Sequence, residues 1–153
     1  MAQPALIENN DEGGSGPSSL DGVLGFHIRL AHGAVYRHFT ETFAALGLTQ
    51  KQVSTLWLIA EAPGIAQSEL GNRLRMDRAT TMSIVGRMQE RDYLWRERCP
   101  ADGRKQLLYL TEAGQVALDE ARRCIAEHEA WLKSRFTSDE VKKLVEMLER
   151  IHD

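Results

Sequence analysis

Apolar side chains recur at helical spacing between residues 20 and 46, which predicts a long first helix. The main stripe consists of Leu24, Ile28, Ala31, Val35, Phe39, Phe43 and Leu46. Phe26 and Leu30 lie on the opposite side of the same helix. We therefore expect this helix to bury two faces, one within its own subunit and one against a partner subunit.

Three shorter helical patterns follow. Gly47 is expected to end the first helix, and Thr49 with Gln52 has the spacing of a capping box that begins the next. That second helix is expected to end at Pro63-Gly64. A short helix is predicted over residues 65–74, and another begins after Asp77 as its N-cap. The inward side chains of the latter are expected to be Thr81, Ile84, Val85 and Met88.

Two strands are predicted next, over residues 93–99 and 105–110, joined by a tight hairpin. Asp102-Gly103 favours a two-residue type I′ turn, in which both central residues have positive φ. Arg104 then lies at the tip of an exposed β-ribbon, beside the Asp102 carboxylate. A cation held at such a tip is suited to entering a DNA minor groove.

Two further helices complete the pattern. The first follows Thr111 as N-cap and runs to about residue 135, with an apolar stripe of Ala117, Ala121, Cys124, Ile125, His128 and Leu132. Thr137 and Glu140 form a second capping box, which opens a last helix with Val141, Leu144, Val145, Leu148 and Ile151 expected inward. Because the first, fifth and sixth helices are too apolar for a monomer of this size, we expect them to hold a homodimer.

The stretch from Asp102 to Gly114 reads Asp-x-Arg-x-x-x-Leu-x-Leu-Thr-x-x-Gly, which resembles the signature of the MarR family of winged-helix transcription regulators. The resemblance extends from about residue 22 to the end and is strongest between Leu70 and Gly114. In the family the Asp orients the Arg, a role that the resemblance gives to Asp102 and Arg104. Asp92 stands where the family usually has Gly, and Gly86 where it is usually polar. We expect Asp92 to tolerate the left-handed conformation.

The fold class is therefore expected to be mainly α, a winged helix-turn-helix with a two-stranded β-wing and long N- and C-terminal dimerisation helices. Residues 1–19, rich in Gly, Ser, Pro, Asn and acid, are expected to be a disordered leader. Residues 20–153 are expected to form one domain. Within it residues 49–110 make the winged helix-turn-helix, and residues 20–46 and 111–152 the dimerisation helices.

The helix after Asp77 is expected to read DNA. A step of about 100° per residue places Ala79, Met82, Ser83 and Gly86 opposite its buried side, flanked by Arg78 and Arg87. A face of small residues edged by arginines fits a major groove. Ser83 is expected at base edges, Ala79 and Met82 at a thymine methyl group, and Arg78 at a guanine. Phosphate contacts are expected from Thr80, and from Gln67 and Ser68 at the start of the preceding helix.

The charge distribution agrees with this expectation. The chain holds 19 Lys/Arg and 22 Asp/Glu, for a net charge of -3. Residues 73–105 contain nine Lys/Arg and five Asp/Glu, a local balance of +4, and the remainder of the chain has -7. Salt screens charges beyond roughly 8–10 Å, so the local balance decides phosphate binding. The alternative is that these charges form an ordinary solvated face.

Several other classes are disfavoured. The longest apolar run, residues 53–60, is far shorter than the roughly 20 residues that span a bilayer, and no signal peptide is evident. Two cysteines give no disulfide framework, so we expect a cytoplasmic protein with free thiols. No phosphate loop, nucleophile elbow or recognisable carboxylate pair is present. We therefore expect no enzyme activity, no catalytic residue, no cofactor and no metal site.

The resemblance implies an operator of double-stranded DNA and a small anionic, often phenolic, effector. Arg29, His32, Tyr36 and Trp57 combine a guanidinium, an imidazole, a phenol and an aromatic wall, which suits an aromatic carboxylate or its CoA thioester. These side chains could instead be ordinary core residues.

Three alternatives for function or control stay open. Cys99 and Cys124 allow a thiol response, although neither lies at a helix N-terminus. A metal response would need clustered ligands, whereas His27, His32 and His38 turn to different sides of one helix; His128 could join one of them. The third alternative is a winged-helix protein-interaction module without DNA binding.

Overall fold

The computed structural model describes residues 16–153; residues 1–15, which make up most of the expected leader, lie outside the described residues. The described residues divide into two units, one up to residue 34 and one over residues 35–153. The first contains the 3-10 helix η1 (Leu20–Gly22) and the beginning of α1 (Leu24–Phe43). Helix α1 is thus shorter than the predicted 20–46, because turns already replace helix after Phe43 and Gly47 has a φ of +60°. Of its predicted stripe, only Phe39 and Phe43 are buried.

Helix α2 (Gln50–Glu61) begins with the predicted capping box. The backbone N–H of Gln52 donates to Thr49 Oγ1 at 3.2 Å, and the N–H of Thr49 donates to Gln52 Oε1 at 3.0 Å. The helix ends before Pro63, as expected. Gly64 follows with a φ of +83°, a conformation that glycine adopts without strain.

Residues 65 and 66 form a strand, so the predicted helix over 65–74 is wrong at its beginning. Strand β1 (Ile65–Ala66) pairs antiparallel with β3 (Gln106–Leu110), and Ile65 lies opposite Leu108. Helix α3 (Gln67–Arg73) begins only after this strand. The sheet therefore has three strands in the order β1-β3-β2, where two were expected. The extra strand covers the free edge of β3, whose backbone would otherwise lack partners.

Helix α4 (Arg78–Glu90) confirms the expected N-cap and inward face. Asp77 Oδ1 accepts a hydrogen bond from the Thr80 N–H at 2.7 Å. The four expected inward side chains, Thr81, Ile84, Val85 and Met88, are all buried. Helix α3 approaches α4 closely at Gly71, where a Cβ atom would lie 2.7 Å from Thr81 Oγ1. This contact packs the two helices of the helix-turn-helix tightly.

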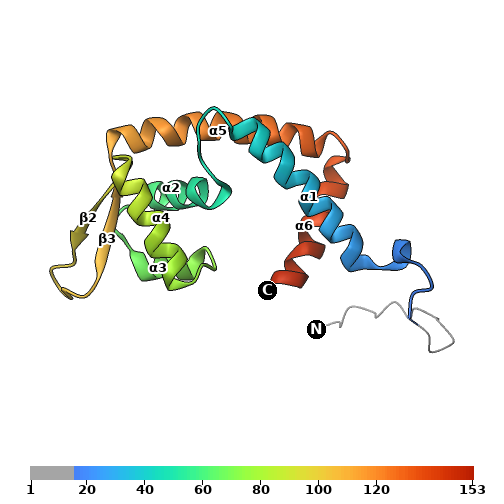
Figure 1. Ribbon diagram of the computed structural model, residues 1–153, viewed down its shortest axis with the longest axis horizontal. Coiled ribbons are helices and arrows are strands. Elements are labelled where there is room, and N and C mark those ends of the chain that lie inside the picture. The colour runs from blue at the N-terminus through green and yellow to red at the C-terminus, as the bar shows by residue number, and fades with distance from the viewer. Residues whose placement is uncertain (1–15) are drawn as a thin grey trace. The chain divides into compact units, whose positions relative to one another are not determined.

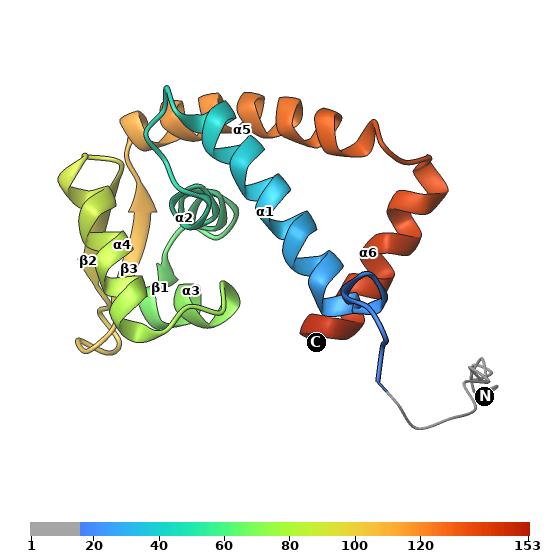
Figure 2. The same ribbon diagram turned by 45° about the vertical axis from the view of Figure 1, so that its right-hand side comes forward.

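Strands β2 (Leu94–Arg98) and β3 form the wing and run side by side in both views (Figures 1 and 2). The predicted type I′ turn is wrong. Among residues 16–153, positive φ values occur only at Gly47, Gly64, Arg75 and Asp92. The wing loop is longer than the expected two-residue turn. Two backbone hydrogen bonds close it: the Cys99 N–H donates to the Lys105 carbonyl oxygen, and the Lys105 N–H donates to the Asp102 carbonyl oxygen. Asp102 shapes it by accepting the Arg104 N–H at 3.1 Å.

The wing joins the helix-turn-helix at Asp92, which has a φ of +60° and confirms the conformation expected there. Helix α5 (Glu112–Lys133) starts beside this turn, with Thr111 Oγ1 accepting the Gly114 N–H at 2.9 Å. A Cβ on Gly114 would lie 1.8 Å from the carbonyl oxygen of Tyr93. Only glycine fits this crossing.

The core lies among the end of α1, helices α2, α3 and α4, the sheet and the first half of α5. Its most completely buried side chains are Phe43, Leu56, Ile59, Leu70, Met88, Leu94, Leu108 and Leu118. Within residues 16–153, no helix has the length and apolar character needed to cross a membrane.

Helix α6 (Ser138–His152) has the predicted capping box between Thr137 and Glu140. Its apolar side chains were expected inward, and this is wrong for a single chain. Val145, Leu148 and Ile151 are 49%, 41% and 63% exposed, and no residue of α6 is buried. The amphipathic pattern is present, but one chain provides no surface that covers it.

Candidate nucleic-acid interface

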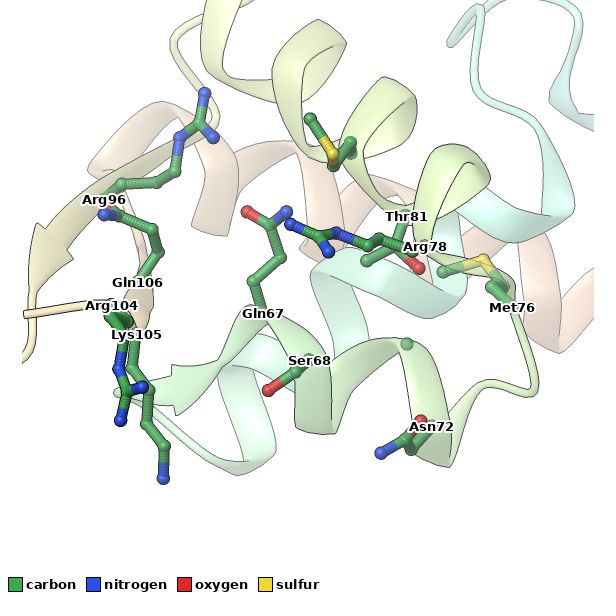
Figure 3. Close-up of a pocket in the computed structure, with 12 residues that line it drawn as sticks. Gln67, Ser68, Asn72, Met76, Arg78, Thr81, Arg96, Arg104, Lys105 and Gln106 are labelled. Atoms are coloured by element: carbon green, nitrogen blue, oxygen red, sulfur yellow. The ribbon is translucent and has the colours of Figure 1, made fainter. Parts of the chain in front are cut away.

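A hollow of about 440 Å³ lies between the helix-turn-helix and the wing (Figure 3). Helix α3 and the start of α4 form one side, and β2, β3 and the wing loop form the other. In Figure 3 the Gln67 and Arg78 side chains extend from the two helices into this space. The lining residues are Gln67, Ser68, Gly71, Asn72, Met76, Arg78, Thr81, Met82, Arg96, Arg104, Lys105 and Gln106.

The hollow brings together five of the ten side chains expected at DNA: Gln67, Ser68, Arg78, Met82 and Arg104. The other five are not among the lining residues. Ala79, Ser83 and Arg87 are exposed on α4, Thr80 is half-buried at its first turn, and Asp102 is half-buried in the wing loop.

Four cations line the hollow: Arg78, Arg96, Arg104 and Lys105. No carboxylate is among the lining residues described. A concave surface with several cations and no anion attracts phosphate groups, whose neutralisation releases counterions from DNA. Nucleic-acid backbone is therefore the ligand class that this surface fits best.

At the wing tip, the Arg104 side chain is 92% exposed and is held by Asp102. Arg104 Nε donates to Asp102 Oδ1 at 3.2 Å, and the same oxygen accepts the Arg104 N–H. The side-chain hydrogen bond from Arg104, followed by the one from its backbone, holds the pKa of Asp102 below its usual value. The carboxylate thus stays ionised and fixes the stem of the arginine, while the Nη atoms point to solvent.

Thr80 has a different role in this structure from the one expected. Its N–H donates to Asp77 Oδ1 at 2.7 Å, and its hydroxyl donates to Oδ2 at 3.1 Å. The backbone hydrogen bond, then the hydroxyl one, lowers the pKa of Asp77. The Thr80 hydroxyl proton is therefore already used within the cap.

Seven further lining residues were not predicted at DNA: Gly71, Asn72, Met76, Thr81, Arg96, Lys105 and Gln106. For Arg96, the alternation of side chains along the strand could have predicted this position. Alternation along β2 puts Arg96 on the same face as the buried Leu94, and the register pairs it with Leu108. The hollow itself depends on how the wing meets α3 and α4, which no local pattern reports.

The residues expected at an effector are divided between the two units. Arg29 and His32 belong to the first unit, where the Arg29 guanidinium lies 5.4 Å from the centre of the Phe26 ring. Tyr36 and Trp57 belong to the second. The Trp57 Nε1–H donates to Glu61 at 2.8 Å, and the Arg122 guanidinium lies 4.9 Å from its ring. Trp57 also lines a hollow of about 240 Å³ with Val53, Ser54, Leu58, Glu61, Leu74 and Ile125.

The histidines that were considered as metal ligands form other contacts. His38 and His128 meet with their Nδ1 atoms 2.8 Å apart, and Trp131 stacks on His38 at 3.9 Å. His27 Nε2 lies 2.7 Å from the carbonyl oxygen of Asp21. Over residues 16–153 no group of three or more His, Cys, Asp or Glu is arranged to hold a metal ion. Cys99 and Cys124 are free, half-buried thiols.

The sequence is similar to those of known transcription regulators. The family model of the MarR family matches residues 46–105. A Thauera aromatica protein named as a transcriptional regulatory protein for the hcr operon is 29% identical over 88% of this chain and 81% of its own length. The homoprotocatechuate degradative operon repressor of Escherichia coli is 26% identical, covering 78% of this chain and 80% of the relative.

Solved structures agree in fold. The transcriptional repressor CouR, bound to a 23-mer DNA duplex, superposes with a TM-score of 0.84 at 29% identity, over 89% of this chain and 96% of CouR. The PcaV regulator of Streptomyces coelicolor, in complex with its natural ligand, gives a TM-score of 0.81 at 25% identity, over 91% and 98%.

Proposed function

We propose that this chain, which belongs to the MarR family of winged helix-turn-helix DNA-binding transcriptional regulators, is a homodimeric repressor whose operator is released by a small aromatic acid or its CoA thioester. The observation that carries the DNA-binding part is the hollow lined by four cations and no carboxylate, beside a wing tip with a fixed arginine.

In the proposed complex, residues 49–110 read DNA. Helix α4 enters a major groove, with Ala79, Met82 and Ser83 at base edges and Arg78 and Arg87 at its rims. Gln67 and Ser68 bind phosphate at the start of α3, and Thr80 can donate to phosphate only if its hydroxyl gives up the hydrogen bond to Asp77 Oδ2. Arg104, oriented by Asp102, enters the adjacent minor groove, where the negative potential favours a guanidinium.

We assign dimerisation to helices within residues 20–46 and 111–152. Support comes from the exposed apolar side chains of α6 and from Leu24 and Ile28 on α1, which a second copy would cover. A two-fold axis then presents two α4 helices about 34–36 Å apart, one turn of DNA, which requires a pseudo-palindromic operator.

The effector assignment rests on chemistry and on relatives. Arg29, His32, Tyr36 and Trp57 supply groups that hold a carboxylate and a ring. PcaV is known in complex with its natural ligand, and the Escherichia coli relative is a repressor of homoprotocatechuate degradation. We propose that ligand binding changes the spacing of the two α4 helices. A coupling of about 1–3 kcal/mol would weaken operator binding roughly 5- to 150-fold.

The test is a titration of the dimer against the DNA upstream of its own gene, at several fixed salt concentrations. Aromatic acids and their CoA thioesters are then added one at a time. We expect tight binding that one compound relieves. Tight binding that no compound relieves would keep the DNA role and contradict the effector. Absence of binding to that DNA and to any genomic fragment would contradict the DNA role and favour a protein-interaction module.

A further inference from the structure

Arg96 lies on the inward face of the wing, just beyond the part of that face that packs against the core. Along β2, Leu94 and Arg96 are two residues apart and therefore point to the same side of the sheet. Leu94 is buried opposite Leu110, whereas Arg96, opposite Leu108, borders the hollow. Two residues along the strand from a buried apolar side chain, the same face of β2 therefore carries a cation at the edge of the basic surface.

The Arg96 side chain is fixed by helix α4. Its Nε donates to Oε1 of Gln89, in the last turn of α4, at 2.7 Å. Within residues 16–153 Arg96 forms no ion pair and no other hydrogen bond. An arginine held through Nε keeps both Nη groups for a second partner, and their parallel N–H bonds match two oxygens of a phosphate.

The position of Arg96 indicates which part of the DNA backbone it would contact. Arg78 on α4, Arg104 at the wing tip and Arg96 on β2 all border the same hollow, and in Figure 3 the Arg96 guanidinium extends to the side away from Arg104. In the proposed complex α4 occupies a major groove and the wing tip the neighbouring minor groove. The sugar-phosphate strand that separates these grooves must pass between α4 and the tip, along the hollow.

We propose that Arg96 binds a phosphate of this intervening strand and that Gln89 is a positioning residue for its guanidinium. The inference rests on the proposed DNA binding and adds a contact to it. Arg96 thereby fixes the distance between the helix in one groove and the wing in the next. A phosphate contact of this kind positions the protein without reading bases.

The experiment measures operator affinity and its salt dependence for Arg96→Ala, Arg96→Lys, Gln89→Leu and the double variant Arg96→Ala/Gln89→Leu. Arg123→Ala removes an exposed arginine from α5 and serves as the matched control. Losing one phosphate contact should lower affinity roughly tenfold and make the slope of log K against log salt shallower by about 0.9. The loss should be equal on operator and on unrelated DNA.

The other variants separate positioning from charge. Gln89→Leu keeps the cation, so affinity should fall only a few-fold with the salt slope unchanged. The double variant should bind no more weakly than Arg96→Ala alone. Arg96→Lys should keep the slope and lose part of the affinity, and it replaces the alanine variant if that one fails to fold.

Two results would overturn the inference while leaving the proposed function intact. One is an Arg96→Ala protein that binds the operator with wild-type affinity and slope. The other is a loss confined to operators with one particular base pair, which would make Arg96 a base-reading residue. If the wild-type protein binds no DNA, the proposed function fails and this inference with it.

Discussion

At the scale of single residues, Gly114 shows how closely two backbones meet. A methyl group there would lie 1.8 Å from the Tyr93 carbonyl oxygen, and backbone must move to admit it. We expect Gly114→Ala to lower the free energy of unfolding by about 2–3 kcal/mol, measured by urea unfolding at constant m-value. Gly86→Ala is the control, since nothing lies within 4 Å of its Cβ position. That helix-interior substitution should stabilise by about 0.5–1 kcal/mol. Equal midpoints for Gly114→Ala and wild type would show that the crossing is loose.

His128 gives a second prediction at this scale, on pH. Burial, followed by the positive charge of His38, lowers the pKa of His128, and Glu129 opposes this. The folded protein therefore binds this proton less well than the unfolded chain, in which the pKa is about 6.5. The contribution to stability is full above that pH and is lost progressively as the pH falls below it.

The measurement is the urea midpoint between pH 7.5 and about 5. His128→Asn keeps an amide near the Nδ1 position but does not titrate, so it should show a weaker fall in midpoint with acid than wild type. His152→Asn should follow wild type. If His128→Asn loses stability with acid as steeply as wild type, the titrating group lies elsewhere.

At the scale of elements, the wing acts as one unit through the Asp102–Arg104 pair. Arg104→Ala should weaken operator binding and make the salt slope shallower by about 1, because in the proposed complex one charge then leaves the minor groove. Asp102→Ala keeps the cation and removes its support, so it should bind more tightly than Arg104→Ala. Arg123→Ala should match wild type. The readout is fluorescence anisotropy at several salt concentrations, and an unchanged slope for Arg104→Ala would remove the wing tip from the interface.

Elements whose signals are local could be predicted from the sequence. The caps at Thr49, Asp77 and Thr137 use side chains that bond backbone three residues away, so residue types and spacing suffice. Ile65-Ala66 could not be predicted in this way. Its strand conformation depends on pairing with residues 107 and 108, far along the chain. Tertiary pairing overrides the local helical pattern there.

In the candidate interface, too, residues with local sequence signals could be predicted, and residues placed by tertiary contacts could not. The signature that includes Asp102 and Arg104 is a short motif, and it led to a pair that the structure confirms. The Asp102-Gly103 signal misled, because the wing loop is closed by backbone hydrogen bonds and shaped by the Asp102 side chain, without positive φ values. Arg96 was missed because its position depends on both the strand register and a contact with Gln89 on another element.

At the scale of the whole molecule, the apolar face of α6 is left uncovered in a single chain. Its capping box and regular apolar stripe specify an amphipathic helix, yet no residue of it is buried. Val145, Leu148 and Ile151 would face water in a monomer, at an unfavourable free energy of roughly 25 cal/mol per Å² of apolar surface. A symmetric dimer removes this surface and also provides the second α4 helix that a palindromic operator needs.

Leu148→Asp tests this arrangement, because it places a charge in the centre of the proposed interface. We expect wild type to sediment as a dimer and the variant as a monomer at the same protein concentration. Its melting temperature should not rise with protein concentration, as that of a dimer does. Lys143→Asp changes charge on the opposite face of α6 and should leave the dimer intact. Because a monomer engages one half-site, Leu148→Asp should lose operator affinity far more than Lys143→Asp. A dimeric Leu148→Asp with normal affinity would place the subunit contact elsewhere.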